Sequence, residues 1–120
     1  MATKKKREYK GTITLDPFFY EVIVIISNDF NATVESFDLG LEFKNKAGLS
    51  LGMEDNHVLI FDATCIDNGI IAHECAHCIF DALDSAGQDP VKGEETFTYL
   101  LQRLVNFCHT ICKKNKVVVS

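Results

Sequence analysis

The sequence predicts an α+β domain in which a small, mostly antiparallel sheet packs on two long helices. Segments with the composition or alternation of strands come first, and two long segments with helical periodicity follow them. The chain has 120 residues, 47% of them hydrophobic, which suffices for one core but not for two. We therefore expect a single domain over residues 13–120, preceded by a basic, flexible tail over residues 1–12. The basic cluster in that tail, residues 4–10, could instead bind an acidic surface.

The first predicted strand spans residues 20–26, which are nearly all apolar and rich in β-branched side chains. This composition is typical of a central strand. A short helix should follow over residues 32–39, with Asn31 as its N-cap and Gly40 near its end.

A hairpin is predicted next. Residues 49–53 alternate in polarity like a half-buried strand, residues 54–56 have the composition of a tight turn, and residues 57–62 form the returning strand. If residues 57–62 are the edge strand beside a cleft, an extended peptide could pair with them.

The first long helix should run over residues 67–86. Asp67 or Asn68 can cap its start, and Gly87 with Pro90 shortly after it can end it. A helical wheel places nearly all ionisable groups on one side and an apolar stripe on the other, so one face should be buried.

The last helix should span residues 93–114. Its apolar stripe consists of Phe97, Leu100, Leu101, Leu104, Phe107, Cys108 and Ile111. Their helical spacing predicts that this helix also packs on the core.

Composition narrows the function classes. A formal net charge of −5 argues against nucleic acid as a default partner. No signal segment is evident, and the longest apolar run, residues 22–26, is far too short to cross a membrane. Five cysteines without a disulfide-framework spacing fit a reducing compartment. We expect a cytoplasmic protein without a membrane partner.

The most informative feature is a His-Glu-x-x-His motif, formed by His73, Glu74 and His77, within the first long helix. Residues four apart lie on one face of a helix, so the two imidazoles can bind one metal ion. Glu74 stands beside them, able to reach a metal-bound water. This is the spacing of zinc peptidases, in which the glutamate acts as general base. The alternative is a polar helix surface that carries two histidines by accident.

A catalytic zinc ion usually has three protein ligands. Asp81 shares the histidine face but lies about 6 Å beyond His77 on a rigid helix. A ligand from a second segment would enclose the ion better, and Glu94 and Glu95 begin the last helix. The wheel favours Glu95, with Glu94 as the alternative, although both could be ordinary first-turn acids favoured by the helix dipole.

The segments 71–77 and 94–100, separated by a glycine-containing turn, carry a resemblance to a known family. They resemble small zincin-fold proteins encoded by bacteriophages, usually described as predicted metallopeptidases. The similarity covers residues 69–112 and is weaker upstream. It implies a minimal zincin-like fold of the glutamate type and a Zn²⁺ cofactor held by His73, His77 and Glu95. It also implies Glu74 as general base, a peptide or protein substrate, and a host cytoplasm as the location.

The sequence also departs from that family pattern. Larger glutamate zincins often carry an Asp four residues after the ligand Glu, where this chain has Tyr99. No His or Tyr can be named from the sequence as the group that stabilises the oxyanion. The alternative function is therefore a catalytically silent, zinc-carrying phage protein that binds or inhibits another protein, and a third is a purely structural metal domain.

Cysteines offer a competing metal site. Two pairs lie on the predicted long helices and could together hold a structural zinc ion: Cys75 and Cys78, and Cys108 and Cys112. Both pairs fall on apolar faces, where reduced cysteine is a common core residue, and we favour that interpretation. His57 and His109 are expected to be structural or exposed.

Overall fold

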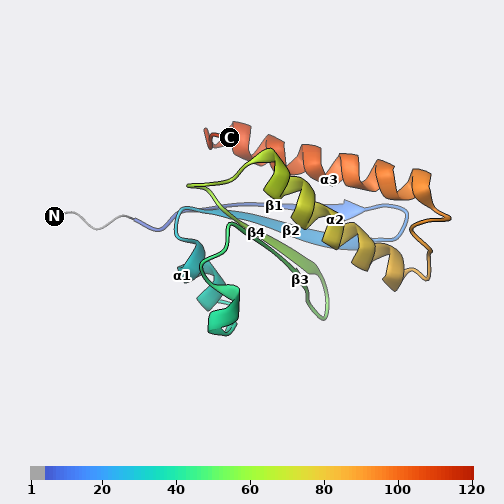
Figure 1. The fold of residues 1–120 in the computed structure, drawn as a ribbon, viewed down its shortest axis with the longest axis horizontal. Coiled ribbons are helices and arrows are strands. Elements are labelled where there is room, and N and C mark those ends of the chain that lie inside the picture. Colours follow the sequence, from blue (N-terminus) through green and yellow to red (C-terminus); the bar gives the residue numbers. More distant parts are fainter. Residues whose placement is uncertain (1–4) are drawn as a thin grey trace.

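The structure, a computed structural model, describes residues 5–120. Its elements appear in chain order in Figure 1. They are β1 (Glu8–Leu15), β2 (Tyr20–Ser27), α1 (Phe30–Glu35), a 3₁₀ turn (Leu41–Phe43), β3 (Gly48–Gly52), β4 (His57–Asp62), α2 (Asn68–Ser85) and α3 (Glu94–Lys114). The predicted α+β class is confirmed.

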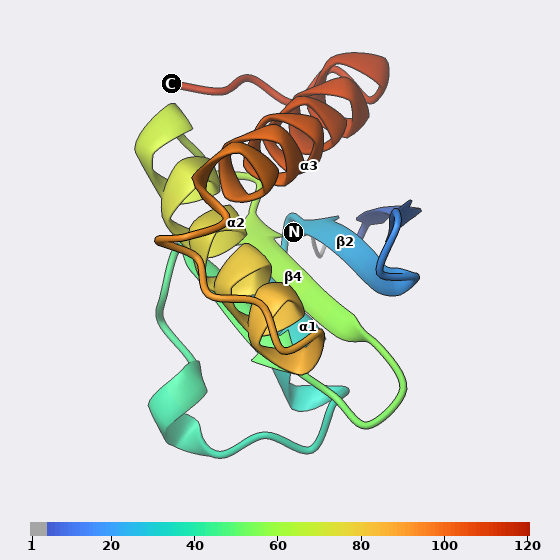
Figure 2. The same cartoon turned by 90° about the vertical axis from the view of Figure 1, so that its right-hand side faces the viewer.

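A single four-stranded sheet forms the centre, in the order β1-β2-β4-β3. The outer pairs, β1–β2 and β3–β4, are antiparallel, whereas β2 and β4 are parallel, so the sheet is mixed. Both long helices cover one face, and α1 lies against the other (Figures 1 and 2). Two separate buried clusters fill these two spaces. The long helices therefore share the larger core.

The expected flexible tail over residues 1–12 is wrong from Glu8 onward. Glu8–Leu15 forms β1, which pairs along its whole length with β2. The side chains of Tyr9, Ile13 and Leu15 pack on the main core, whereas the alternate residues Lys10, Thr12 and Thr14 are exposed. This two-residue alternation is a strand signal that the neighbouring lysines and arginine obscured. Residues 1–4 of the expected tail lie outside the described residues.

The short helix α1 begins earlier than predicted. Its N-cap is Asp29, whose side chain accepts a hydrogen bond from the amide of Ala32 at 3.2 Å, and not Asn31. The Asn31 amide instead bonds the side chain of Asn45. Phe30 is buried in the smaller core, which explains why the helix starts there.

The predicted hairpin is confirmed, but its strand at the edge of the sheet is β3 and not β4. β4 lies between β2 and β3, so residues 57–62 are not the edge strand and the peptide pairing considered for them does not apply. Residues 57–61 are all buried, as befits an inner strand flanked on both sides. β3 is the free edge beside α2, and β1 forms the opposite edge of the sheet.

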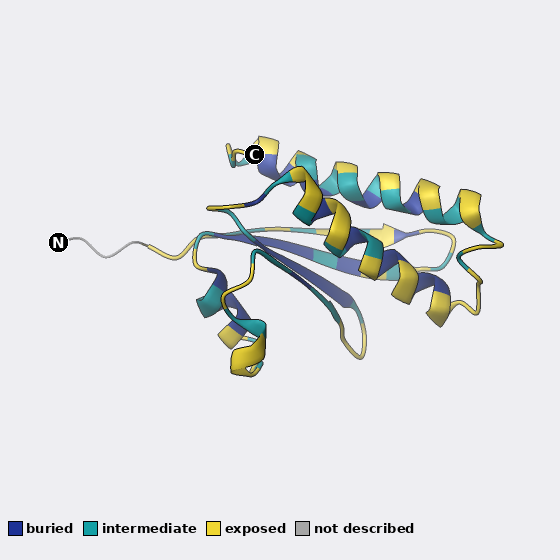
Figure 3. Ribbon diagram, in the orientation of Figure 1, coloured by how far each residue is buried: buried dark blue, intermediate teal, exposed yellow. Residues whose placement is uncertain are grey.

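Both long helices match the prediction closely. Asp67 caps α2 through a 2.7 Å hydrogen bond from the amide of Ile70. Figure 3 shows each helix divided lengthwise into a buried and an exposed face. The α2 motif is therefore presented by a helix whose opposite face is fixed in the core.

Candidate metal centre

The metal motif lies on the exposed face of α2. Its neighbours Ile71, Cys75, Cys78, Ile79, Ala82 and Leu83 are buried, whereas His73 and His77 are exposed and Glu74 is half-buried. The predicted amphipathic wheel is thus confirmed. Because the buried face holds α2 against the sheet, the two imidazoles project from a rigid helix.

The two histidines approach each other closely. Their Nε2 atoms are 3.2 Å apart, and the rings meet edge to face at a centroid distance of 4.8 Å. One ligand atom from each of His73, Glu74 and His77 lies within 4.8 Å of the others. Within residues 5–120 these three form the one such group able to hold a metal ion.

The donor set suits zinc. Two imidazole nitrogens and a carboxylate oxygen are ligands that Zn²⁺ commonly takes in proteins. The same carboxylate can instead accept a proton from a bound water, so Glu74 can serve as ligand or as base. The geometry leaves both roles open to it.

Glu74 is turned toward the edge strand β3. A methyl group built on Gly48 would lie 3.0 Å from Glu74 Cγ and 2.9 Å from Ile70 Cγ2, so a glycine is required for this close approach. A cavity of about 540 Å³ opens at this point, lined by Lys46, Gly48, Ile70, His73 and Glu74 among others. The motif therefore borders a hollow beside the free edge of the sheet.

Glu95 and Glu94 are not part of the group with the two histidines. Both are exposed in the first turn of α3. The long helices run antiparallel, and the rings of Phe97 and Phe80 meet at 4.8 Å (Figure 1). The start of α3 thus lies beside the last turns of α2, beyond His77. The assignment of Glu95 as third ligand stays a prediction.

A second histidine site was missed by the sequence analysis. His57 is fully buried, with Tyr20 Oη 2.9 Å from its Nδ1 and Ser50 Oγ 2.6 Å from its Nε2. The Asp81 carboxylate lies 3.7 Å from Nδ1. Burial lowers the pKa of His57 below its usual 6.5, and the charge of Asp81 opposes this shift. Ser50 lies across the predicted hairpin from His57, whereas Tyr20 and Asp81 come from distant elements that no local spacing could have revealed.

The cysteines behave as core residues. Cys75, Cys78, Cys108 and Cys112 are free and buried, and the sulfur atoms of Cys75 and Cys108 are 3.7 Å apart. Burial raises the pKa of the Cys78 and Cys112 thiols, and a hydrogen bond with Cys75 together with burial raises that of Cys108. Among the described residues, the group of side chains able to hold a metal ion contains none of these cysteines. Reduced core cysteines are the interpretation that the structure supports.

No family model matches the chain, and no curated protein or solved structure matches it either. The resemblance to phage zincin-fold proteins therefore stays a prediction. No helix among the described residues has the length and apolar character needed to span a membrane.

Proposed function

We propose that the protein is a zinc-dependent metallopeptidase. One observation carries the proposal: His73, Glu74 and His77 converge within 4.8 Å on the exposed face of a rigid helix. Zinc peptidases use two imidazoles at this spacing as metal ligands and the adjacent carboxylate as general base. Under this proposal the fold is a minimal zincin, and the protein acts in the cytoplasm of a cell that a phage has infected.

The residues of this chain then have distinct roles. His73 and His77 hold the metal, and Glu95 is the proposed third ligand with Glu94 as alternative. Zinc, when bound, polarises a carbonyl and lowers the pKa of a coordinated water. Glu74 would act as the general base, taking a proton from a water molecule at this site and giving it to the leaving amine.

The open edge of β3 is the proposed substrate platform. Asp62 N donates a hydrogen bond to Ala47 O, and Met53 N donates one to Asn56 O. Ala47 and Met53, at the two ends of β3, therefore direct their backbone groups toward the partner strand. Along an antiparallel strand, residues whose backbone groups bond to the partner alternate with residues whose backbone groups point away from it. The backbone groups of Gly48, Ser50 and Gly52 therefore point away from β4. An extended peptide can pair with these free groups. It would then lie beside Glu74, which contacts the start of the same strand.

The test measures bound zinc and hydrolysis of a peptide library. It compares the native protein with Glu74→Gln and, as matched control, Glu42→Gln, which changes an exposed acid in the 3₁₀ turn on the other side of the sheet. We expect native protein and control to bind zinc and cleave. Glu74→Gln should keep zinc and lose about 10²–10⁴-fold in kcat, the range for a general base. A native protein without zinc would contradict the proposal.

One observation favours a second function, a zinc-carrying binding or inhibitory protein. Among the described residues, no ligand from a second segment joins the two histidines. Zinc bound without hydrolysis in either native protein or Glu74→Gln would support this alternative. Substituting Glu95→Gln and Glu94→Gln separately, and measuring zinc affinity, then identifies which glutamate completes the site.

A further inference from the structure

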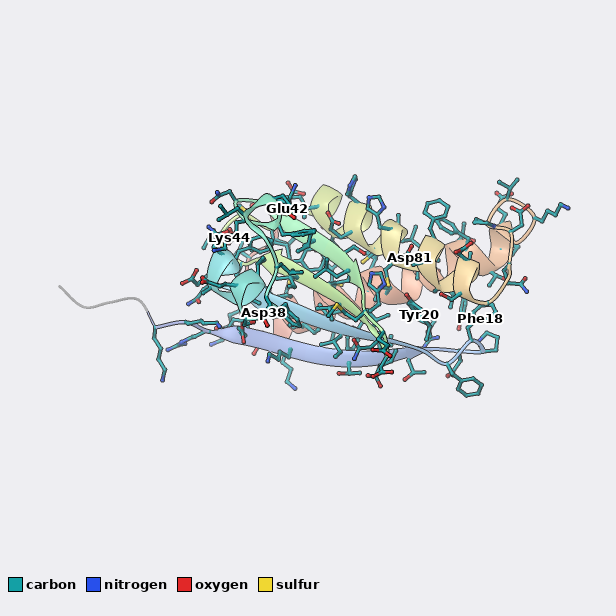
Figure 4. All side chains as sticks on the ribbon, turned by 90° about the horizontal axis from the view of Figure 1, so that it is seen from below. Phe18, Tyr20, Asp38, Glu42, Lys44 and Asp81 are labelled. Carbon is teal, nitrogen blue, oxygen red and sulfur yellow. The ribbon has the colours of Figure 1, made fainter. Side chains whose placement is uncertain are left out.

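A second cluster of reactive groups lies between β3, β4 and α2, apart from the metal motif. Ser50 Oγ is 2.6 Å from His57 Nε2, and the opposite ring nitrogen faces Tyr20 Oη at 2.9 Å and the Asp81 carboxylate at 3.7 Å. Tyr20 and Asp81 lie near one another in Figure 4. The order of groups is thus hydroxyl, imidazole, then phenol and carboxylate.

Electrostatics select one tautomer of His57. A carboxylate near Nδ1 favours a proton on that nitrogen, because a lone pair there would face the negative charge of Asp81. Tyr20 Oη can accept the resulting Nδ1–H hydrogen bond. Nε2 is then an acceptor, so the Ser50 hydroxyl donates to it. This proton arrangement is the one that activates a serine as a nucleophile.

Burial keeps the base ready for this role. His57 is fully buried, and burial lowers its pKa, so the imidazole is neutral at neutral pH and able to accept a proton. Asp81 is the charged group that faces the imidazole, with its carboxylate 3.7 Å from Nδ1.

Ser50 is also accessible. It is only partly buried, on the free edge strand, and both of its same-face neighbours along β3 are glycines, Gly48 and Gly52. Its backbone N–H points away from β4 and is a free donor next to Oγ. That N–H can bond a developing oxyanion. A cavity of about 480 Å³, lined by Tyr20, Gly52 and Asp81 among others, adjoins the cluster.

We propose that Ser50 is a nucleophile, with His57 as its base and Asp81 and Tyr20 orienting that base, and that carboxylic esters are its substrates. Ser50 Oγ attacks the carbonyl carbon while its proton passes to His57 Nε2. The bond to the alcohol oxygen breaks, and His57 returns the proton to the departing alkoxide. Water then attacks the acyl group on Ser50 with His57 again as base, which releases the acid and restores the hydroxyl.

The test uses a fluorophosphonate, which forms a stable Ser50 Oγ–P bond as fluoride leaves and His57 takes the proton. The full chain is treated at neutral pH with EDTA present, so the result does not depend on the metal site. Intact mass and peptide mapping locate the adduct. Ser85 serves as the internal control, because it is exposed at the end of α2 and forms no hydrogen bond with a histidine among residues 5–120.

We expect one adduct on Ser50, formed at least about ten times faster than any on Ser85, and absent in Ser50→Ala. Asp81→Asn changes an exposed carboxylate, so the fold should survive, and labelling should slow about ten-fold or more. Circular dichroism checks both variants for folding. Labelling of Ser50 no faster than Ser85, or unaffected by Asp81→Asn, would overturn the proposal. So would the lack of any Ser50 adduct in the folded native protein.

Discussion

The protein holds two histidine clusters that differ in how they are built. His73 and His77 are exposed and belong to one helix, so their 3.2 Å approach follows from a spacing of four residues. His57 is fully buried, and its partners Tyr20, Ser50 and Asp81 come from β2, β3 and α2. The first cluster is set by local geometry and is free to bind a ligand. The second depends on the whole fold and contributes to its stability.

The largest expected difference between the two clusters is in stability. His57→Ala removes a buried ring and leaves Tyr20 and Ser50 without their shared partner, so we expect a loss of about 3–5 kcal/mol. His73→Ala, the matched control on the exposed face, should change the free energy of unfolding by about 0.5 kcal/mol or less. Urea denaturation in EDTA measures both. Similar losses of unfolding free energy in His57→Ala and His73→Ala would contradict the claim that only the buried cluster stabilises the fold.

Zinc should stabilise the protein through the exposed histidines and not through the buried cluster. If the exposed histidines hold zinc, a free zinc concentration of 100 times the dissociation constant stabilises the native protein by about 2.7 kcal/mol. EDTA should remove this gain. His77→Ala should lose the gain entirely while keeping its metal-free stability, whereas Tyr20→Phe, which changes only the buried cluster, should keep it. Thermal unfolding with and without zinc gives the answer. If zinc still stabilised His77→Ala, His77 would not be a zinc ligand.

A smaller effect is expected at Gly48, where β3 passes the metal motif. Gly48→Ala would bring a methyl group to 2.9 Å from Ile70 Cγ2 and 3.0 Å from Glu74 Cγ, so side chains must move. We expect a loss of about 1–3 kcal/mol, the range for overpacking, and a displaced Glu74. Gly69→Ala is the control, because its methyl group would meet only Asp67 Oδ1 at 3.4 Å. Equal stability of the two variants in urea denaturation would show that β3 does not press on α2.

The contrast also explains what the sequence could predict. Periodicity and capping residues gave α2 and α3 nearly to the residue, and with them the His-Glu-x-x-His face, because these features depend on neighbours along the chain. β1 was missed because its short alternation is interrupted by charged residues, and β4 was misplaced at the edge because strand order is a long-range property. The Ser50–His57 contact lies within the predicted hairpin but depends on its exact register, and the approach of Tyr20 and Asp81 to His57 depends on strand order and on where α2 lies.

The smallest expected effect is a dependence of stability on pH that belongs to the buried cluster. In the unfolded chain His57 takes up a proton near its usual pKa of 6.5, whereas burial lowers the pKa in the native protein. The unfolded state therefore binds more protons below about pH 6.5, and the stability due to neutral His57 is complete above that pH. It is lost as pH falls from 6.5 through the lowered native pKa.

The Asp81 carboxylate opposes the lowering of the His57 pKa, so Asp81→Asn should lower that pKa further and deepen the loss of stability as pH falls below 6.5. Asp84→Asn is the matched control, because Asp84 lies on the same face of α2 and forms no ion pair with His57. Urea denaturation at several pH values in EDTA compares the two variants with the native protein. Parallel profiles for both variants would mean that Asp81 does not act on the imidazole, and the orientation of His57 would then depend on Tyr20 and Ser50 alone.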